Sequence, residues 1–168
     1  MFGSITGDGK SAFLWKGKMV VDSTGNINLD DPNEPFNKVD RSAVGVTINA
    51  GTTLSGTQAN QVALADIFSF TPSGIEYREM LNGGIINLTG TNAVGIYTAS
   101  GKITNNGTVS STGTNGIGLF GENGTVISNG TSGIVNVGNM GIGLYGISNQ
   151  NSATPQGNGN GSVNITNS

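Results

Sequence analysis

Side chains able to do acid–base chemistry are few in this sequence, and most of the acids gather in two short stretches. The 168 residues include 10 acidic and 7 basic side chains, with no histidine and no cysteine. Glycoside hydrolysis needs two carboxylates roughly 5–10 Å apart, and a polysaccharide lyase needs a base beside a charge clamp. The available sets lie within residues 30–41 and 61–81: Asp40 with Arg41, and Glu76 with Arg78 and Glu79. We interpret them as solvated loop charges and predict no catalytic site.

The acidic residues near position 30 raise the question of a bound cation. Asp30, Asp31 and Glu34 stand close together, beside two prolines. Their spacing matches neither the EF-hand loop nor the calcium-binding nonapeptide repeat. Because prolines cannot donate to a strand ladder, residues 30–41 are predicted to form a solvated loop that bulges from the fold. Without histidine or cysteine, we also predict no metal site and no cofactor.

Aromatic residues end three similar segments and are candidates for a binding surface. Tyr97, Phe120 and Tyr145 recur at nearly equal spacings along the chain. If Val94 and Ile96 point inward, strand alternation turns Tyr97 outward, and the other two rings lie one and two turns above it. Rings stacked about 5 Å apart would form a flat platform for sugar rings or for an apolar patch on a partner. The alternative is that the rings sit at a corner, where they cover backbone or enter the core.

These segments belong to a repeat around which the chain is organised. Thr-Asn-Ala-Val-Gly-Ile-Tyr at 91–97 becomes Thr-Asn-Gly-Ile-Gly-Leu-Phe at 114–120 and Asn-Met-Gly-Ile-Gly-Leu-Tyr at 139–145. A second marker, Gly-x-(Ile/Val)-Asn-(Leu/Val/Ile), begins at Gly25, Gly84, Gly133 and Gly161. Self-similarity at a period of roughly 20–50 residues is typical of solenoids.

The residues inside each copy predict short strands joined by corners. Apolar residues alternate with others, as in a strand that buries one face. The alternating runs are 86–88, 94–96, 117–119 and 142–144. Corners are predicted at pairs that accept positive φ, namely Asn106-Gly107, Asn123-Gly124 and Asn129-Gly130. We therefore predict an all-β parallel β-helix of about 23–25 residues per coil, with Ile117 and Leu119 pointing inward and Thr114 outward.

The whole chain is predicted to form a single β-helix segment. Residues 1–24 contain the only tryptophan, Trp15, and form either a cap or a first strand. Two excursions, at 30–41 and 61–81, interrupt the coils, and the coils become regular over 84–168.

The positions of Gly45 and Gly161 support two further predictions. Gly45 and Gly95 stand in similar sequence contexts, and we interpret their separation as two turns. Gly161 begins another copy of the second marker close to Ser168, so we expect the chain to be a piece of a longer protein whose preceding and following coils pack against it.

The composition limits the partners that the surface can bind. Glycine accounts for 29 residues, the net charge is −3, and Lys102 and Glu122 are the only charged residues beyond Met80. So neutral a surface predicts no nucleic-acid partner and no anionic membrane partner. No apolar run reaches the length needed to cross a bilayer. The ordered alternation of Ile, Val and Leu argues against a disordered low-complexity chain.

The Gly-Ile-Tyr, Gly-Leu-Phe and Gly-Leu-Tyr segment ends, with the Gly-x-(Ile/Val)-Asn strand starts, resemble the passenger repeats of type V autotransporter adhesins, especially the large fusobacterial outer-membrane adhesins. The resemblance covers residues 84–168 and, more loosely, begins at Gly25. It implies a right-handed parallel β-helix displayed outside a Gram-negative cell, at the outer membrane. It also implies adhesion to a host or bacterial surface protein or glycan, and it supplies no catalytic motif. The alternative is a polysaccharide-degrading β-helix enzyme.

A uniform coil surface offers little to distinguish one partner from another, so binding residues are predicted where the repeat is broken. Loops on a rigid scaffold concentrate binding residues, and Tyr and Arg often carry interface energy. The predicted binding residues are Asp31, Glu34, Tyr77 and Arg78 in the excursions and Tyr97, Phe120 and Tyr145 in the aromatic column. The other possibility is a segment that only spaces the fibre away from the cell.

Overall fold

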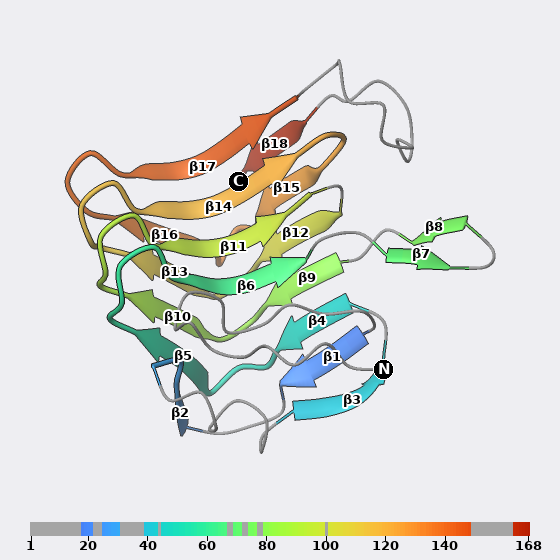
Figure 1. The fold of residues 1–168 in the computed structure, drawn as a ribbon, viewed down its shortest axis with the longest axis horizontal. Helices are drawn as coiled ribbons and strands as arrows, with labels where there is room; N and C mark the ends of the chain where they lie inside the picture. Colours follow the sequence, from blue (N-terminus) through green and yellow to red (C-terminus); the bar gives the residue numbers. More distant parts are fainter. Residues whose placement is uncertain are drawn as a thin grey trace.

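The chain folds into a stack of β-strands wound around one core (Figure 1). This computed structural model describes residues 18–21, 25–30, 39–43, 45–66, 69–71, 74–76, 79–99, 101–148 and 163–168. All of the regular secondary structure within these residues is β-strand, and they contain no helix. Three sheets enclose the core, and two further strands form a separate hairpin.

From residue 45 onward the chain visits the three sheets in a fixed order, and we call them sheets I, II and III. Sheet I contains β2 (Gly25–Asn28), β5 (Thr52–Gly56), β10 (Ile85–Leu88), β13 (Thr108–Ser111) and β16 (Ile134–Val137). Sheet II contains β6 (Val62–Asp66), β11 (Val94–Thr98), β14 (Ile117–Glu122) and β17 (Ile142–Ile147). Sheet III contains β1 (Lys18–Val21), β3 (Val39–Ala43), β4 (Gly45–Ile48), β9 (Glu79–Asn82), β12 (Lys102–Asn105), β15 (Val126–Asn129) and β18 (Asn164–Asn167).

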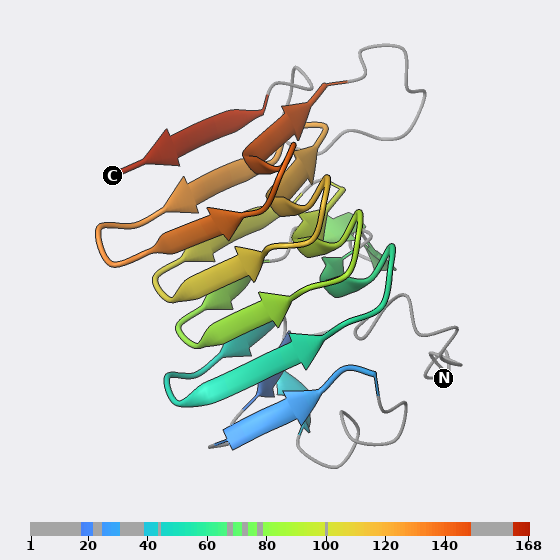
Figure 2. The ribbon, with the colours of Figure 1, turned by 90° about the vertical axis from the view of Figure 1, so that its left-hand side faces the viewer.

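Parallel pairing between successive coils makes the architecture a parallel β-helix, as predicted. In sheet II, Val94 pairs with Ile117 and Ile117 pairs with Ile142, so each pair joins corresponding positions of successive copies. The regular coils of sheets I and III pair in the same way. Figure 2 shows the strands stacked one coil above another. Equivalent residues of the repeat therefore lie directly above one another.

Two coils are longer than the rest because segments leave the stack. Val46 pairs with Met80 across the first of them, and Val126 pairs with Asn164 across the second. The first of these coils includes the antiparallel hairpin of β7 (Ser69–Thr71) and β8 (Gly74–Glu76), which projects from the side of the stack (Figure 1). The second includes residues 149–162, which lie outside the described part of the chain.

The predicted 61–81 excursion is shorter than expected. Residues 62–66 and 79–81 of this excursion belong to the coil strands β6 and β9, because Ala63, Leu64 and Met80 are buried in the core. At the other excursion, Val39–Ala43 forms β3, which runs antiparallel to β1 at the edge of sheet III. Asp31 and Glu34 lie outside the described residues.

Two predictions about which strands stack above one another are wrong, and the reason is the same for both. Gly45 and Gly95 are not two turns apart, because Gly45 lies in sheet III and Gly95 in sheet II. The second marker also changes sheets: its first three copies are in sheet I, but the copy that begins at Gly161 leads into β18 of sheet III. Residue types define a strand, but the lengths of the connecting segments decide which sheet it joins.

Inward columns of aliphatic residues form the core. Sheet I contributes Ile27, Leu54, Ile86 and Val109, sheet II contributes Leu64, Ile96 and Leu119, and sheet III contributes Val46, Ile48, Met80, Ile103 and Ile127. These side chains are buried, most of them completely. Full burial of one such side chain stabilises a fold by about 1.5–3 kcal/mol, and these residues recur in every coil.

Sheet II departs from strict alternation, which corrects the predicted orientation of Val94 and Ile117. Ile96 and Leu119 are completely buried, whereas Val94 and Ile117 are partly exposed on the outer face. In each strand a glycine, Gly95 or Gly118, lies between the partly exposed residue and the buried one, so the glycines also form a column. A Cβ at Gly118 would lie 2.3 Å from Cγ1 of Val135, so this position also faces the core and accepts no side chain. The glycine and the aliphatic residue that follows it both face the core. The residues immediately before and after this pair therefore face outward.

The corner between sheets I and II is built from a column of residues with positive φ. These are Asn60, Asn92, Asn115 and Met140, with φ between 56° and 60°. The three asparagines are linked by hydrogen bonds along the stack, with Asn92 Nδ2 donating to Asn60 Oδ1 and Asn115 Nδ2 to Asn92 Oδ1. Among the predicted Asn-Gly corners, positive φ is confirmed at Asn123-Gly124 alone.

Met140→Asn is expected to stabilise the protein. Met140 has φ of 57° and a 75% exposed side chain, where an asparagine could donate to Asn115 Oδ1. A left-handed conformation costs an ordinary residue about 1–2 kcal/mol, and asparagine tolerates it better. We expect the melting temperature to rise by about 2–4 °C, measured by circular dichroism. Met140→Ala keeps the unfavourable φ and should give no such rise; an equal rise in both variants would contradict the explanation.

A second asparagine ladder runs inside the stack, at the corner between sheets III and I. Asn82 Nδ2 donates to Asn105 Oδ1 (2.8 Å), Asn105 Nδ2 to Asn129 Oδ1 (2.7 Å) and Asn129 Nδ2 to Asn167 Oδ1 (2.8 Å). The same amide groups of Asn82 and Asn105 also reach backbone carbonyls of the next coil, at Thr108 and Ile134. The first two side chains are completely buried, so their polar groups depend on the ladder.

Candidate functional site

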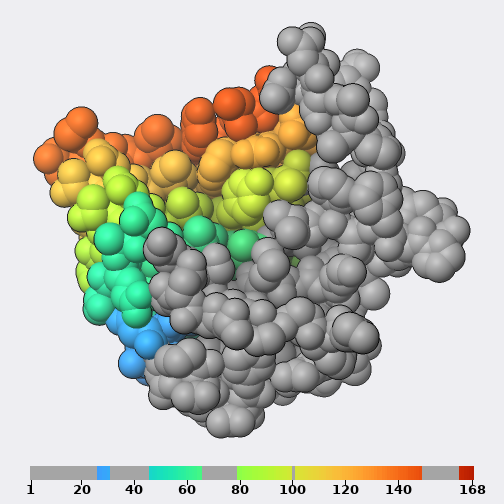
Figure 3. All heavy atoms as spheres, viewed as in Figure 1, coloured from blue at the N-terminus to red at the C-terminus, as the bar shows by residue number. Residues whose placement is uncertain are grey.

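The outer face of sheet II carries partly exposed apolar side chains in every described coil. It consists of two columns, one on each side of the inward glycine and leucine positions. The aliphatic column is Val62, Val94, Ile117 and Ile142, and the aromatic column is Tyr97, Phe120 and Tyr145. All seven side chains are partly or largely exposed, and Ile142 reaches 44% exposure. In the space-filling view, the later coils cross this side of the molecule as parallel bands (Figure 3).

The structure brings the three predicted aromatic residues together, but their rings do not form a flat platform. The Tyr97 and Phe120 ring centroids are 5.1 Å apart with 63° between the ring planes, an edge-to-face contact. Phe120 and Tyr145 are 5.0 Å apart and inclined at 42°. Inclined rings avoid the unfavourable face-to-face overlap of their quadrupoles. The three rings therefore share no common flat face, and the column is better suited to apolar packing than to a stacked sugar ring.

Glu122 adds one charged group to this face and lies close to Tyr97. Burial, the negative charge of Glu122 and a hydrogen bond to its carboxylate together raise the pKa of Tyr97 to about 12. The neutral phenol can donate to the carboxylate, whereas the phenolate would repel it. Tyr97 is therefore a neutral hydrogen-bond donor at physiological pH, in a surface that is otherwise apolar.

Tyr97 is expected to ionise near pH 12, later than an ordinary phenol. Its pKa is higher in the folded chain than in the unfolded chain, so the folding stability that it contributes falls as the pH rises from about 10 to about 12. Phenolate absorbance of the wild type minus that of Tyr97→Phe should show the late titration. The stability of Tyr97→Phe should fall less over the same pH window. A difference spectrum that titrates near pH 10 would contradict the proposed contact with Glu122.

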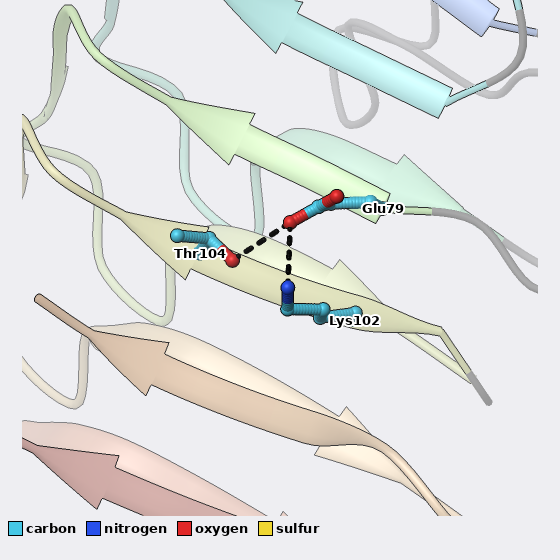
Figure 4. A network of polar contacts seen from close by, with 3 residues as sticks. All are labelled: Glu79, Lys102 and Thr104. Atoms are coloured by element: carbon cyan, nitrogen blue, oxygen red, sulfur yellow. Dashed lines mark hydrogen bonds and ion pairs between the residues drawn. The ribbon is translucent and has the colours of Figure 1, made fainter.

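Glu79 and Lys102 neutralise each other on sheet III. Lys102 Nζ lies 3.0 Å from Glu79 Oε1 in the coil below, and Thr104 Oγ1 donates to the same oxygen at 3.0 Å (Figure 4). Both charged side chains are about half exposed, at 51% and 49%, so the pair contributes only about 0–1 kcal/mol to stability. Glu79 is therefore held by local partners and lies on a different sheet from Glu122.

Asp30 is held by local contacts at the first described coils. Thr57 donates to its carboxylate from the hydroxyl and the backbone N–H, and Gln61 Nε2 donates at 3.0 Å. Burial alone would raise the pKa of Asp30, but hydrogen bonds from Thr57, Gln61 and the backbone of Gln58 together lower it. The carboxylate thus fixes the turn after β2 to the next coil, which is a structural role that the sequence did not indicate.

The other predicted binding residues cannot be placed beside this surface. Tyr77 and Arg78, like Asp31 and Glu34, lie outside the described residues. The described residues include no group of three or more acidic, histidine or cysteine side chains that could hold a metal ion. They also include no helix that is long and apolar enough to cross a membrane.

The aliphatic column was missed because strict alternation placed its residues in the core. The signal was present in the sequence: Val94, Ile117 and Ile142 are each followed by glycine, and a glycine at an inward position leaves the preceding side chain outward. Together the columns form a surface four coils high whose only charged group, among the described side chains, is Glu122. Comparisons with protein-family models, curated proteins and solved structures give no match to this chain.

Proposed function

We propose that this chain is a segment of a surface-displayed bacterial adhesin, of the autotransporter passenger type, and that the outer face of sheet II is its binding surface. The observation that supports this proposal is the double apolar column, which remains partly exposed over three coils of a rigid stack and continues into a fourth at Val62. Contiguous exposed apolar surface is uncommon on soluble proteins and marks interaction sites. The same stack also acts as a spacer, because each coil adds about 4.8 Å along the fibre axis.

The shape of this surface favours a protein partner over a glycan. Inclined rings next to branched aliphatic side chains offer ridges and grooves that complement an apolar protein patch. A sugar ring would need a flat aromatic face and several polar groups arranged around it. We therefore propose a host or bacterial surface protein as the partner of this surface.

The test compares two double variants with similar changes in hydrophobicity. Ile117→Ser with Phe120→Ser removes the centre of the double column, and Ile85→Ser with Ile134→Ser removes exposed aliphatic residues from the outer face of sheet I. Binding of the purified chain to host and bacterial cells is measured by flow cytometry, before and after protease treatment of the cells. We expect protease treatment to abolish binding and the sheet II variant to weaken it at least about tenfold, while the sheet I variant binds normally.

Three outcomes would contradict parts of this proposal. Binding that survives protease but is lost after glycosidase treatment would indicate a glycan partner. Loss of binding in Tyr77→Ala with Arg78→Ala, but not in the sheet II variant, would move the site to the 61–81 excursion. Release of reducing ends from a polysaccharide, abolished by Glu76→Gln or Asp40→Asn, would replace the adhesin with a polysaccharide-degrading enzyme. Melting temperatures of all variants separate loss of binding from loss of folding.

A further inference from the structure

The described part of the chain contains five Asn-Gly pairs, and each of them can react with itself. The pairs begin at Asn82, Asn106, Asn115, Asn123 and Asn129. The backbone nitrogen of the glycine can attack the side-chain amide carbon of the asparagine, because glycine has no side chain to hinder the approach. The attack requires that the glycine nitrogen lose its proton and that the chain rotate locally. A pair should therefore react slowly where its glycine N–H is held in a hydrogen bond of the folded stack.

In four of the five pairs the glycine N–H donates to a backbone carbonyl. Gly83 donates to Ile48 (2.8 Å), Gly107 to Asn82 (3.0 Å), Gly130 to Asn105 (2.9 Å) and Gly116 to Gly113 (3.2 Å). Asn82 and Asn129 are also buried, and the inner asparagine ladder fixes their side chains. Reaction at these pairs requires the stack to open locally.

The pair Asn123-Gly124 differs from the other four. It occupies the two central positions of a tight turn between β14 and β15, which Thr125 N closes by donating to Glu122 O at 3.2 Å. Both central residues have positive φ, 42° and 84°, as in a type I′ turn. Among the described residues, no acceptor bonds the N–H of Gly124, and both residues of the pair are partly exposed. The glycine nitrogen of this pair is therefore the one that a solvent base can deprotonate without opening the stack.

We propose that Asn123 is a site of spontaneous deamidation. The deprotonated nitrogen of Gly124 attacks Cγ of Asn123 and forms a new C–N bond. The bond from Cγ to the side-chain amide nitrogen then breaks, and this nitrogen takes a proton from water and leaves as ammonia. Water opens the resulting five-membered succinimide at either carbonyl, which gives aspartate or isoaspartate. Nothing is oxidised or reduced, and water is the only co-reactant.

The reaction changes the charge and the backbone at the edge of sheet II. Asn123 directly follows Glu122, whose carboxylate accepts a hydrogen bond from Tyr97. A second carboxylate thus arises beside the only charged group, among the described side chains, of the outer face of sheet II. Isoaspartate also lengthens the backbone by one carbon atom in the turn that leads into β15. The inference is independent of the binding function proposed for sheet II, because the reaction requires only the turn.

The test is incubation of the full chain at mildly alkaline pH, folded in buffer and, as the matched control, unfolded in urea. Tandem mass spectrometry of proteolytic peptides follows the conversion of amide to acid at each Asn-Gly pair. In the folded chain we expect Asn123 to react at least about tenfold faster than Asn82 or Asn129, since those pairs must wait for local opening. In urea the hydrogen bonds are lost, so the rates at the five pairs should become similar.

Three results would overturn the proposal. Equal rates at all five pairs in the folded chain would show that the free N–H of Gly124 confers no reactivity. A faster reaction at Asn106 or Asn115, whose side chains are exposed, would show that exposure of the asparagine governs the rate instead. An unreacted Asn123 in the folded chain, after the unfolded chain has converted, would show that the turn protects the pair.

Discussion

Leu119→Asp is expected to prevent the chain from folding at room temperature. Leu119 is completely buried between Ile96 and Leu144 in the inward column of sheet II. The substitution removes the aliphatic contacts, at a cost of about 2–5 kcal/mol, and it also places an unpaired carboxylate in the core, which costs several kcal/mol more. Typical domains have only about 5–15 kcal/mol in total, so this variant should lose its strand signal in circular dichroism.

Ile117→Asp and Thr114→Asp are the matched controls for this result. Ile117 lies two positions away in the same strand but on the partly exposed outer face, and Thr114 is exposed. Substitutions on the outer face leave the new carboxylate in contact with water, so we expect both variants to fold, with losses of about 1 kcal/mol or less for Thr114→Asp. An unfolded Ile117→Asp beside a folded Leu119→Asp would show that the faces of β14 are reversed.

Asn105→Ala is expected to destabilise the fold by about 2–4 kcal/mol, through the inner asparagine ladder. Asn105 is completely buried, accepts from Asn82 and donates to Asn129. Alanine leaves a buried donor on one side and a buried acceptor on the other, and water cannot easily replace the missing partner. Urea unfolding at constant m-value measures this loss. Asn136→Ala removes an exposed amide that donates to Ser110 Oγ on the outer face, and it should cost less than about 1 kcal/mol.

Asn105→Asp distinguishes the ladder from simple packing. The carboxylate can accept from Asn82, but it opposes the Oδ1 acceptor of Asn129. A protonated carboxyl group can do both, so the folded state should hold the proton more tightly than the unfolded state. Stability should therefore be higher at acid pH and fall as the pH rises through the pKa of the folded form. A pH-independent loss equal to that of Asn105→Ala would assign the effect to packing.

The fold class followed from the sequence because its signals are local and repeated. Apolar alternation within a short run predicts a strand with a buried face, and copies that recur at nearly equal spacing predict strands stacked in parallel. The recurrence of Tyr97, Phe120 and Tyr145 at this spacing predicted their column for the same reason, and the structure confirms it.

The assignment of faces and sheets was decided only in the tertiary structure. Strict alternation placed Val94 and Ile117 in the core, but a valine from sheet I occupies the space beside the inward glycine of each of these strands and leaves both residues outside. No pattern within one strand reports what a different sheet places against it.

The roles of the asparagines at the corners were also decided only in the tertiary structure. Asn129 precedes glycine and was predicted to form a positive-φ corner, yet it belongs to the inner ladder, whereas Asn115 has positive φ at a corner. Asparagine suits either role, as a residue that tolerates positive φ or as an amide that donates and accepts. The role of an asparagine depends on the residues stacked above and below it, each one coil away along the chain. It also depends on the corner of the coil at which the asparagine lies. The repeat therefore determined which residues stack together, and the winding of the coil decided whether each stack faces water or the core.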